Sequence, residues 1–224
     1  MTGKPDWDRA RWLWLAALVG GASFFVAVLE RWDGPAIWAW KTSGVALLAA
    51  WAAANARGRD GWMIAAALGF GALGDWLLDA AGLMQGAAAF AVGHAIAITL
   101  YLGNRRAAMT RSQALLVFAV VPLALLVAWG LTRHAEPAQM SAAICYTAIV
   151  ALMAATAWAS RFPRYRTGIG AMIFLASDLF IFAGEGGALS KDITMWFVWP
   201  LYFAGQALIA WGVVATLASE TAKR

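Results

Sequence analysis

Two aspartates and one histidine lie deep inside apolar segments of the sequence, where a titratable side chain is unusual. Asp75 lies in the run GDWLL, Asp178 in the run SDLFI and His94 in the run VGHAI. Removal from water favours the protonated form of a carboxyl group, and a second carboxylate nearby keeps one member of a pair protonated while the other is ionised. Such a pair could donate and accept protons in one reaction, while the imidazole orients a water molecule. These residues therefore predict acid and base catalysis.

Five more polar side chains in apolar segments could bind a polar substrate. They are Lys41, Tyr146, Ser177, Tyr202 and Gln206. An amine can hold a phosphate as a point charge, and hydroxyl and amide groups can bond to substrate oxygens. Ordinary structural roles stay open, because Lys41 could extend its side chain to the membrane surface and the tyrosines could be interior residues with satisfied hydroxyl groups. Asp79, close to a segment end, is more simply explained as an interfacial or capping group.

Residue counts limit the alternative chemistries. Two histidines and a single cysteine, Cys145, exclude a three-histidine zinc site, a cysteine-based zinc cluster and an intrachain disulfide. One histidine with two aspartates could still hold a metal, and a triad of Ser177, His94 and an aspartate is conceivable, although no nucleophile elbow surrounds the serine. We expect no metal and no cofactor.

A glycine-rich run at residues 69–74, GFGALG, matches the GxGxxG dinucleotide fingerprint. No strand precedes it, and it lies inside an apolar segment, so it lacks the context of a nucleotide site. We interpret these glycines as places where a neighbouring helix approaches closely and leaves room beside Asp75.

The segments that carry these residues are long enough to cross a membrane. The chain has 224 residues, of which 62% are hydrophobic and 13% are charged, whereas a soluble domain carries about 25% charge. Apolar runs of about 18 residues or more can cross ~30 Å of hydrocarbon as helices, and no alternation typical of a barrel is present. We predict an all-α, polytopic integral membrane protein, a single transmembrane domain over residues 1–224 with eight helices. These are expected at residues 12–29, 36–54, 62–80, 85–103, 112–131, 138–160, 167–184 and 193–218.

Basic residues alternate between the two ends of these helices. Thirteen of the 17 Lys and Arg residues lie in the terminal segments and the second, fourth and sixth loops, whereas the other loops hold Arg31, Arg133 and Lys191. The positive-inside rule then predicts cytoplasmic termini, in what we expect to be a bacterial inner membrane. The net charge of +5 is explained by topology, and no basic stripe indicates nucleic acid.

Once the helices are oriented, the polar side chains inside them share one level. Each lies roughly 3 to 13 residues, about 5 to 20 Å, from the outer end of its helix. An intramembrane charge costs about 2.5 to 3.5 kcal/mol to insert, so we infer one shared pocket in the outer half of the bilayer. The runs around Asp75 and Asp178 share a small residue, an aspartate and apolar residues, which suggests a weak parallel four-plus-four repeat.

Together these residues resemble the YhhN-type lysoplasmalogenases. The resemblance covers about residues 38–214, with the order and spacing of the motifs intact. The motifs are Lys41, GDWLL at 74–78, Phe90 with Gly93-His94, Gly170-Ala171 with Phe174 and Ser177-Asp178, and Tyr202 with Gly205-Gln206. Two positions depart from the family: Ala97 stands where a tyrosine is expected, and Gly205 where alanine is usual. The resemblance implies a multispan hydrolase that cleaves the vinyl ether of a lysoplasmalogen into a fatty aldehyde and glycerophosphocholine or glycerophosphoethanolamine.

This reaction gives each candidate residue an expected role. Protonation of a vinyl ether on carbon produces an oxocarbenium ion that water captures, so one aspartate would be the acid and the other its ionised partner, with His94 orienting the water. Lys41 would hold the phosphate, while Tyr146, Ser177, Tyr202 and Gln206 would contact the glycerol. The expected partners are a lysophospholipid with a vinyl ether chain and the surrounding membrane lipids. A proton-coupled transporter and a lysolipid-binding protein stay open as alternatives, because intramembrane carboxylates also relay protons.

Overall fold

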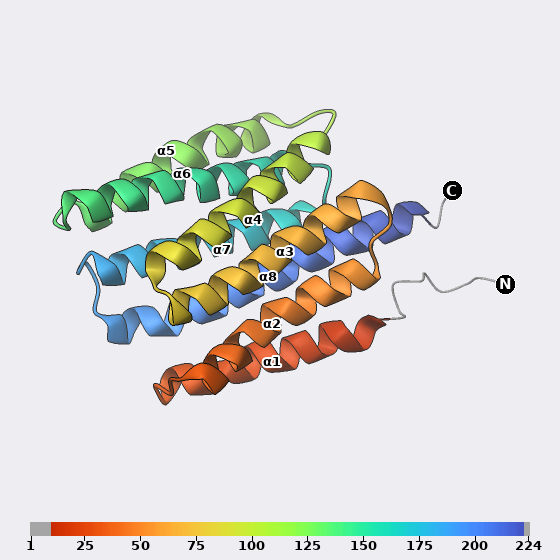
Figure 1. Ribbon diagram of the computed structural model, residues 1–224. Helices are drawn as coiled ribbons and strands as arrows, with labels where there is room; N and C mark the ends of the chain where they lie inside the picture. Colours follow the sequence, from red (N-terminus) through yellow and green to blue (C-terminus); the bar gives the residue numbers. More distant parts are fainter. Residues whose placement is uncertain (1–9, 222–224) are drawn as a thin grey trace.

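Eight long α-helices form the fold in the computed structural model, which describes residues 10–221 (Figure 1). They are α1 (Arg11–Leu29), α2 (Pro35–Ala54), α3 (Gly58–Ala80), α4 (Leu83–Gly103), α5 (Arg111–Thr132), α6 (Pro137–Ala159), α7 (Ile169–Glu185) and α8 (Lys191–Thr221). A short π-helix, η2 (Arg164–Gly168), precedes α7 directly. Residues 10–221 contain no β-strand, which confirms the all-α prediction, and each predicted segment coincides with one helix. The terminal basic residues used in the charge comparison, Lys4, Arg9, Lys223 and Arg224, lie outside the described residues.

Seven of these helices are long and apolar enough to cross a membrane, which supports a multi-pass membrane protein. The helix outside this set is α2, which contains Lys41 and the tryptophans Trp38, Trp40 and Trp51. Large apolar side chains cover much of the outer surface; Phe118 of α5, for example, is 76% exposed. Apolar surface of this extent is the expected face toward lipid chains.

The longest helix, α8, contacts both halves of the chain. It packs against α1, α2 and α3 and against η2 and α7. In Figure 1, α1 and α2 lie at one side of the bundle and α5 and α6 at the opposite side, and α1 begins at the same end at which α8 finishes. Of the helices that carry candidate residues, α2, α3 and α7 therefore pack directly against α8, whereas α4 packs against α3 and α6.

Two glycines allow close packing of α7 against α8. A Cβ atom at Gly205 would lie 2.8 Å from the carbonyl oxygen of Gly170, and one at Gly170 would lie 2.8 Å from the carbonyl oxygen of Gly205. Two small residues allow the backbones to approach closely, as is common between membrane helices. An alanine at position 205 would therefore collide with α7.

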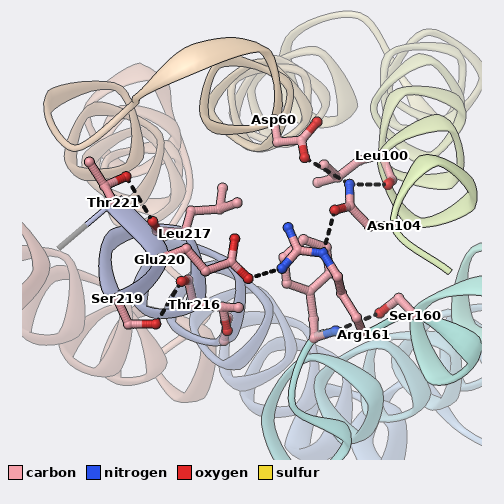
Figure 2. A network of polar contacts seen from close by, with 12 residues as sticks. Asp60, Leu100, Asn104, Ser160, Arg161, Thr216, Leu217, Ser219, Glu220 and Thr221 are labelled. Atoms are coloured by element: carbon pink, nitrogen blue, oxygen red, sulfur yellow. Dashed lines mark hydrogen bonds and ion pairs between the residues drawn. The ribbon is translucent and has the colours of Figure 1, made fainter. Parts of the chain in front are cut away.

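A polar network connects α3, the end of α4, the segment after α6 and the end of α8 (Figure 2). Asn104, which follows α4, donates from its amide to Asp60 Oδ2 at 2.8 Å and to the Leu100 carbonyl at 2.9 Å. Arg161 donates from Nε to Asn104 Oδ1 at 2.6 Å and forms an ion pair with Glu220 of α8. Because Asn104 is buried, these contacts satisfy polar groups that water does not reach.

This network predicts an unequal effect of two matched substitutions. Asn104→Ala removes two bonds to charged side chains, and we expect it to lower the free energy of unfolding by about 2 kcal/mol, or the melting temperature by roughly 4 to 8 °C. Asn55→Ala is the control, because Asn55 caps α2 and its amide bonds only to the Trp51 carbonyl among the described contacts. Thermal unfolding of both variants in detergent tests this, and equal losses would contradict the role of the network.

Candidate functional site

Buried contacts connect Asp75 with His94 through two aromatic rings. The Tyr202 hydroxyl donates to Asp75 Oδ2 at 2.8 Å, and both residues are buried. The Tyr202 ring packs edge-on against Phe174, with ring centroids 5.2 Å apart, and Phe174 packs edge-on against His94 at 4.9 Å. Four helices, α3, α4, α7 and α8, thus contribute to one cluster.

The same cluster extends to Asp178 through Tyr146. The Tyr146 hydroxyl lies 3.4 Å from Nε2 of His94, and Tyr146 and Asp178 both form part of the wall of one cavity. The structure therefore brings together the three residues predicted to be catalytic, around the tyrosines predicted to bind substrate. They come from three different helices, α3, α4 and α7.

Asp178 differs from Asp75 in its surroundings. It is only 5% exposed, and its Oδ2 atom has no hydrogen-bond partner among residues 10–221. The side chain forms part of the wall of an apolar cavity of about 400 Å³ between α4, α6 and α7. Buried carboxylate oxygens normally have partners, so a free one at a cavity wall is typical of a site that acts on a ligand.

A smaller cavity of about 30 Å³ lies beside His94. Its wall includes His94, Ala97, Tyr101 and Gln206. This volume is sufficient for one water molecule, and the polar side chains can bind it. Ala97 contributes only a methyl group to this wall.

The hydroxyl of Ser177 is engaged by the backbone. It donates to the carbonyl oxygen of Val198 at 2.9 Å, two residues before Pro200 inside α8. Ser177 is fully buried and lines neither cavity beside the cluster. Its contact joins α7 to α8 next to Asp178, so its place in the structure is that of a positioning residue.

Lys41 pairs with Asp79 rather than with either buried aspartate. Its Nζ atom lies 2.9 Å from both carboxylate oxygens of Asp79, and both side chains are partly buried. We explained Asp79 from the sequence as an interfacial or capping group, and this partner was missed. The spacing of Asp75 and Asp79 could have predicted this pair, because it places two carboxylates on one face of a helix at the level of Lys41.

The Lys41–Asp79 pair lies in the wall of a second large cavity, of about 420 Å³, at the end of the bundle where α1 finishes and α2 and α8 begin. The charged residues of this wall are Arg31, Asp33, Lys41, Asp79, Glu185 and Lys191, and its indole rings belong to Trp32, Trp38 and Trp199. Lys191 and Glu185 pair at 2.8 Å. Basic and acidic groups are balanced, so this wall suits a polar ligand that carries both charges.

Asp33, in the loop between α1 and α2, is held in its ionised form at this wall. The Trp38 indole N–H and the Gly34 backbone N–H donate to its Oδ1 atom, at 2.6 and 2.7 Å. These two bonds hold the pKa of the Asp33 carboxyl below its ordinary value. They also fix the orientation of the Trp38 ring at the mouth of the cavity.

Within residues 10–221, no group of three or more His, Cys, Asp and Glu side chains is arranged to hold a metal ion. The cluster instead contains two carboxyl groups, one imidazole and two phenols, which are proton-transfer groups. The chemistry that this arrangement supports is the movement of protons beside an apolar cavity.

Comparisons with known proteins identify relatives of this chain. The model of the YhhN family matches residues 36–213. Two proteins named lysoplasmalogenase, one from Mycobacterium bovis and one from Mycobacterium tuberculosis, are each 32% identical to this chain over 180 residues. Those matches cover 78% of this chain and 69% of each relative. No solved structure matches the chain.

The glycine run at residues 69–74 yields a test of the packing around Asp75. A Cβ atom at Gly74 would lie 2.8 Å from the Phe90 ring, which packs against Tyr202, whereas one at Gly69 would meet nothing within 4 Å. We expect Gly74→Ala to destabilise the fold by about 1 to 3 kcal/mol and Gly69→Ala to leave it unchanged or slightly stabilised. Thermal unfolding distinguishes them, and a neutral Gly74→Ala would show that Phe90 has room to move.

Proposed function

The chain belongs to the YhhN family, and we propose that it is an intramembrane hydrolase that cleaves the vinyl ether bond of lysoplasmalogens. The products would be a fatty aldehyde and glycerophosphocholine or glycerophosphoethanolamine. The observation that carries this proposal is the unpartnered carboxylate oxygen of Asp178 at the wall of the apolar cavity, in one cluster with Asp75. The names of the relatives support the choice of substrate.

Asp178 is the proposed acid in this reaction. Its place beside an apolar cavity suits a vinyl ether, because the two double-bond carbons are apolar. The one that is not bonded to oxygen must accept a proton. The carboxylic acid transfers its proton to that carbon, and the double-bond electrons form the new C–H bond. In the resulting oxocarbenium ion, the positive charge is shared between the ether oxygen and the former double-bond carbon to which it is bonded.

Asp75 is the proposed ionised partner. Tyr202 donates to its carboxylate, and Lys41 and Asp79 are the charged residues that act on it electrostatically. A negative charge in a site with little water stabilises the oxocarbenium ion far more than it would in solution. Water then adds to the carbon bonded to oxygen and gives its proton to a carboxylate. The hemiacetal then loses its hydroxyl proton while the glycerol oxygen gains one. The bond between that oxygen and the former alkenyl carbon breaks, and the aldehyde and the alcohol separate.

His94 and Gln206 are the proposed water-binding residues, since both form part of the wall of the 30 Å³ cavity. Tyr146 would connect His94 with the substrate oxygen, because its hydroxyl faces both the imidazole and Asp178. Lys41, at the wall of the outer cavity, would hold the phosphate. Binding there requires the phosphate to share Lys41 with Asp79.

We also propose that all eight helices cross a bacterial inner membrane, with both termini in the cytoplasm and the site in the outer half of the bilayer. The 20 residues of α2 extend about 30 Å, and this helix packs against α1, α3 and α8. Its one charged residue within the span, Lys41, has a partner in Asp79. The parallel relation of α1–α4 to α5–α8 stays a prediction.

The roles of the aspartates predict the effect of removing each carboxylate. We expect Asp75→Asn and Asp178→Asn each to reduce aldehyde release by at least about 100-fold, as the loss of a placed acid or charge does, while thermal unfolding stays cooperative. The control is Glu136→Gln, which removes an exposed carboxylate directly before α6. Unchanged aldehyde release in both aspartate variants would exclude the mechanism, and substrate-dependent ion flux without aldehyde would favour a transporter.

The proposed bond cleavage predicts where the oxygen of water appears. In water enriched in oxygen-18, water attacks the alkenyl carbon, so the released glycerophosphocholine keeps its original oxygen and remains unlabelled. Mass spectrometry of this product is a stable readout, because an alcohol oxygen does not exchange with water. Label in the glycerophosphocholine would mean attack at the glycerol carbon and would contradict protonation of the vinyl ether.

A further inference from the structure

We propose that the apolar cavity opens sideways to the bilayer between the outer halves of α4 and α6, and that the alkenyl chain of the substrate enters and the aldehyde leaves by this opening. This assignment rests on the proposed function and deepens it, because it separates the path of the hydrocarbon chain from that of the headgroup. The outer polar cavity would serve the headgroup alone.

Exposed side chains mark the opening on both of its edges. On α4, Leu83 and Met84 line the cavity and are 46% and 66% exposed. On α6, Cys145 lines the same cavity and is also exposed. Residues that belong both to the cavity wall and to the outer surface lie at its mouth. In a membrane-spanning bundle that mouth faces lipid chains, which suits a hydrocarbon ligand.

The dimensions of the cavity match one lipid chain. Its wall on α6 extends from Gln139 to Ile149, a rise of about 15 Å at 1.5 Å per residue, which is half of a hydrocarbon core ~30 Å thick. Its volume of about 400 Å³ lies in the range of about 300 to 1,000 Å³ typical of small-molecule sites. A chain that belongs to one leaflet can therefore enter without crossing the bilayer midplane.

The cavity meets the outer polar cavity at two shared residues. Ile181 and Glu185 of α7 form part of both walls, and Asp178 lies one turn of α7 below Ile181. A lysolipid that places its headgroup beside Lys41 and its chain in the apolar cavity must pass Ile181. The junction of headgroup and chain, where the vinyl ether lies, would then be next to Asp178.

Cys145 provides a reporter without any engineering, since it is the single cysteine of the chain. In lipid nanodiscs, we expect an alkyl-ether lysolipid, which has no vinyl group to hydrolyse, to slow maleimide labelling of Cys145 at least fivefold, and hexadecanal to do the same. Glycerophosphocholine, which has no chain, should leave the labelling rate unchanged. Cys145→Ser establishes the unlabelled background.

A pair of matched variants tests the mouth itself. Ala88 and Ala95 are both exposed alanines of α4, but Ala88 lines the cavity and Ala95 does not. We expect Ala88→Trp to reduce aldehyde release at least tenfold and to abolish protection of Cys145 by the alkyl-ether lysolipid. Ala95→Trp should retain both, and thermal unfolding verifies that each variant folds.

The outcomes separate this proposal from the proposed function. Aldehyde release without any protection of Cys145 would overturn the chain site and leave the hydrolase in place. Protection of Cys145 without aldehyde release would support the chain site and overturn the hydrolase. Equal effects of Ala88→Trp and Ala95→Trp would overturn the opening between α4 and α6.

Discussion

A charged or polar side chain inside hydrocarbon must find its partner within the protein, because water is absent and insertion costs about 2.5 to 3.5 kcal/mol for each ion. In this chain the partners come from different helices: Asp75 of α3 meets Tyr202 of α8, Asp79 of α3 meets Lys41 of α2, and His94 of α4 meets Tyr146 of α6. The contacts that make the site are therefore also contacts that determine how the bundle packs. Among the carboxylates of residues 10–221, Asp178 is the one that has a buried oxygen without a partner, at the wall of an apolar cavity. The proposed chemistry depends on this free oxygen.

Small residues allow the helices to come close enough for these contacts. Gly170 and Gly205 bring the backbones of α7 and α8 together, and Gly74 receives the ring of Phe90 beside Asp75. Gly71 leaves space for the amide of Gln206, because a Cβ atom there would lie 2.9 Å from its Nε2 atom. The sequence analysis interpreted the glycines at 69–74 as places where a neighbouring helix approaches closely. This holds for Gly71 and Gly74, whereas Gly69 faces open space.

The helices could be predicted from the sequence because the thickness of the hydrocarbon core sets the number of apolar residues that a spanning helix needs. It also indicated that the polar residues share a level, since depth follows from counting residues along a helix. Counting does not give the rotation of a helix or the identity of a neighbour, which are decided by side-chain packing between segments far apart in the chain. For this reason the sequence did not predict the Lys41–Asp79 pair, the backbone partner of Ser177, the π-helix before α7 or the division of the expected pocket into separate cavities.

The length of α8 makes the site dependent on the thickness of the membrane. Its 31 residues extend about 46 Å, well beyond ~30 Å of hydrocarbon, and ion pairs hold it near both ends, from Asp192 to Arg31 and from Glu220 to Arg161. A helix anchored at both surfaces responds to hydrophobic mismatch by tilting. Because Tyr202 lies between these anchors, we expect the lipid composition of the bilayer to act on the contact between Tyr202 and Asp75 without occupying the site.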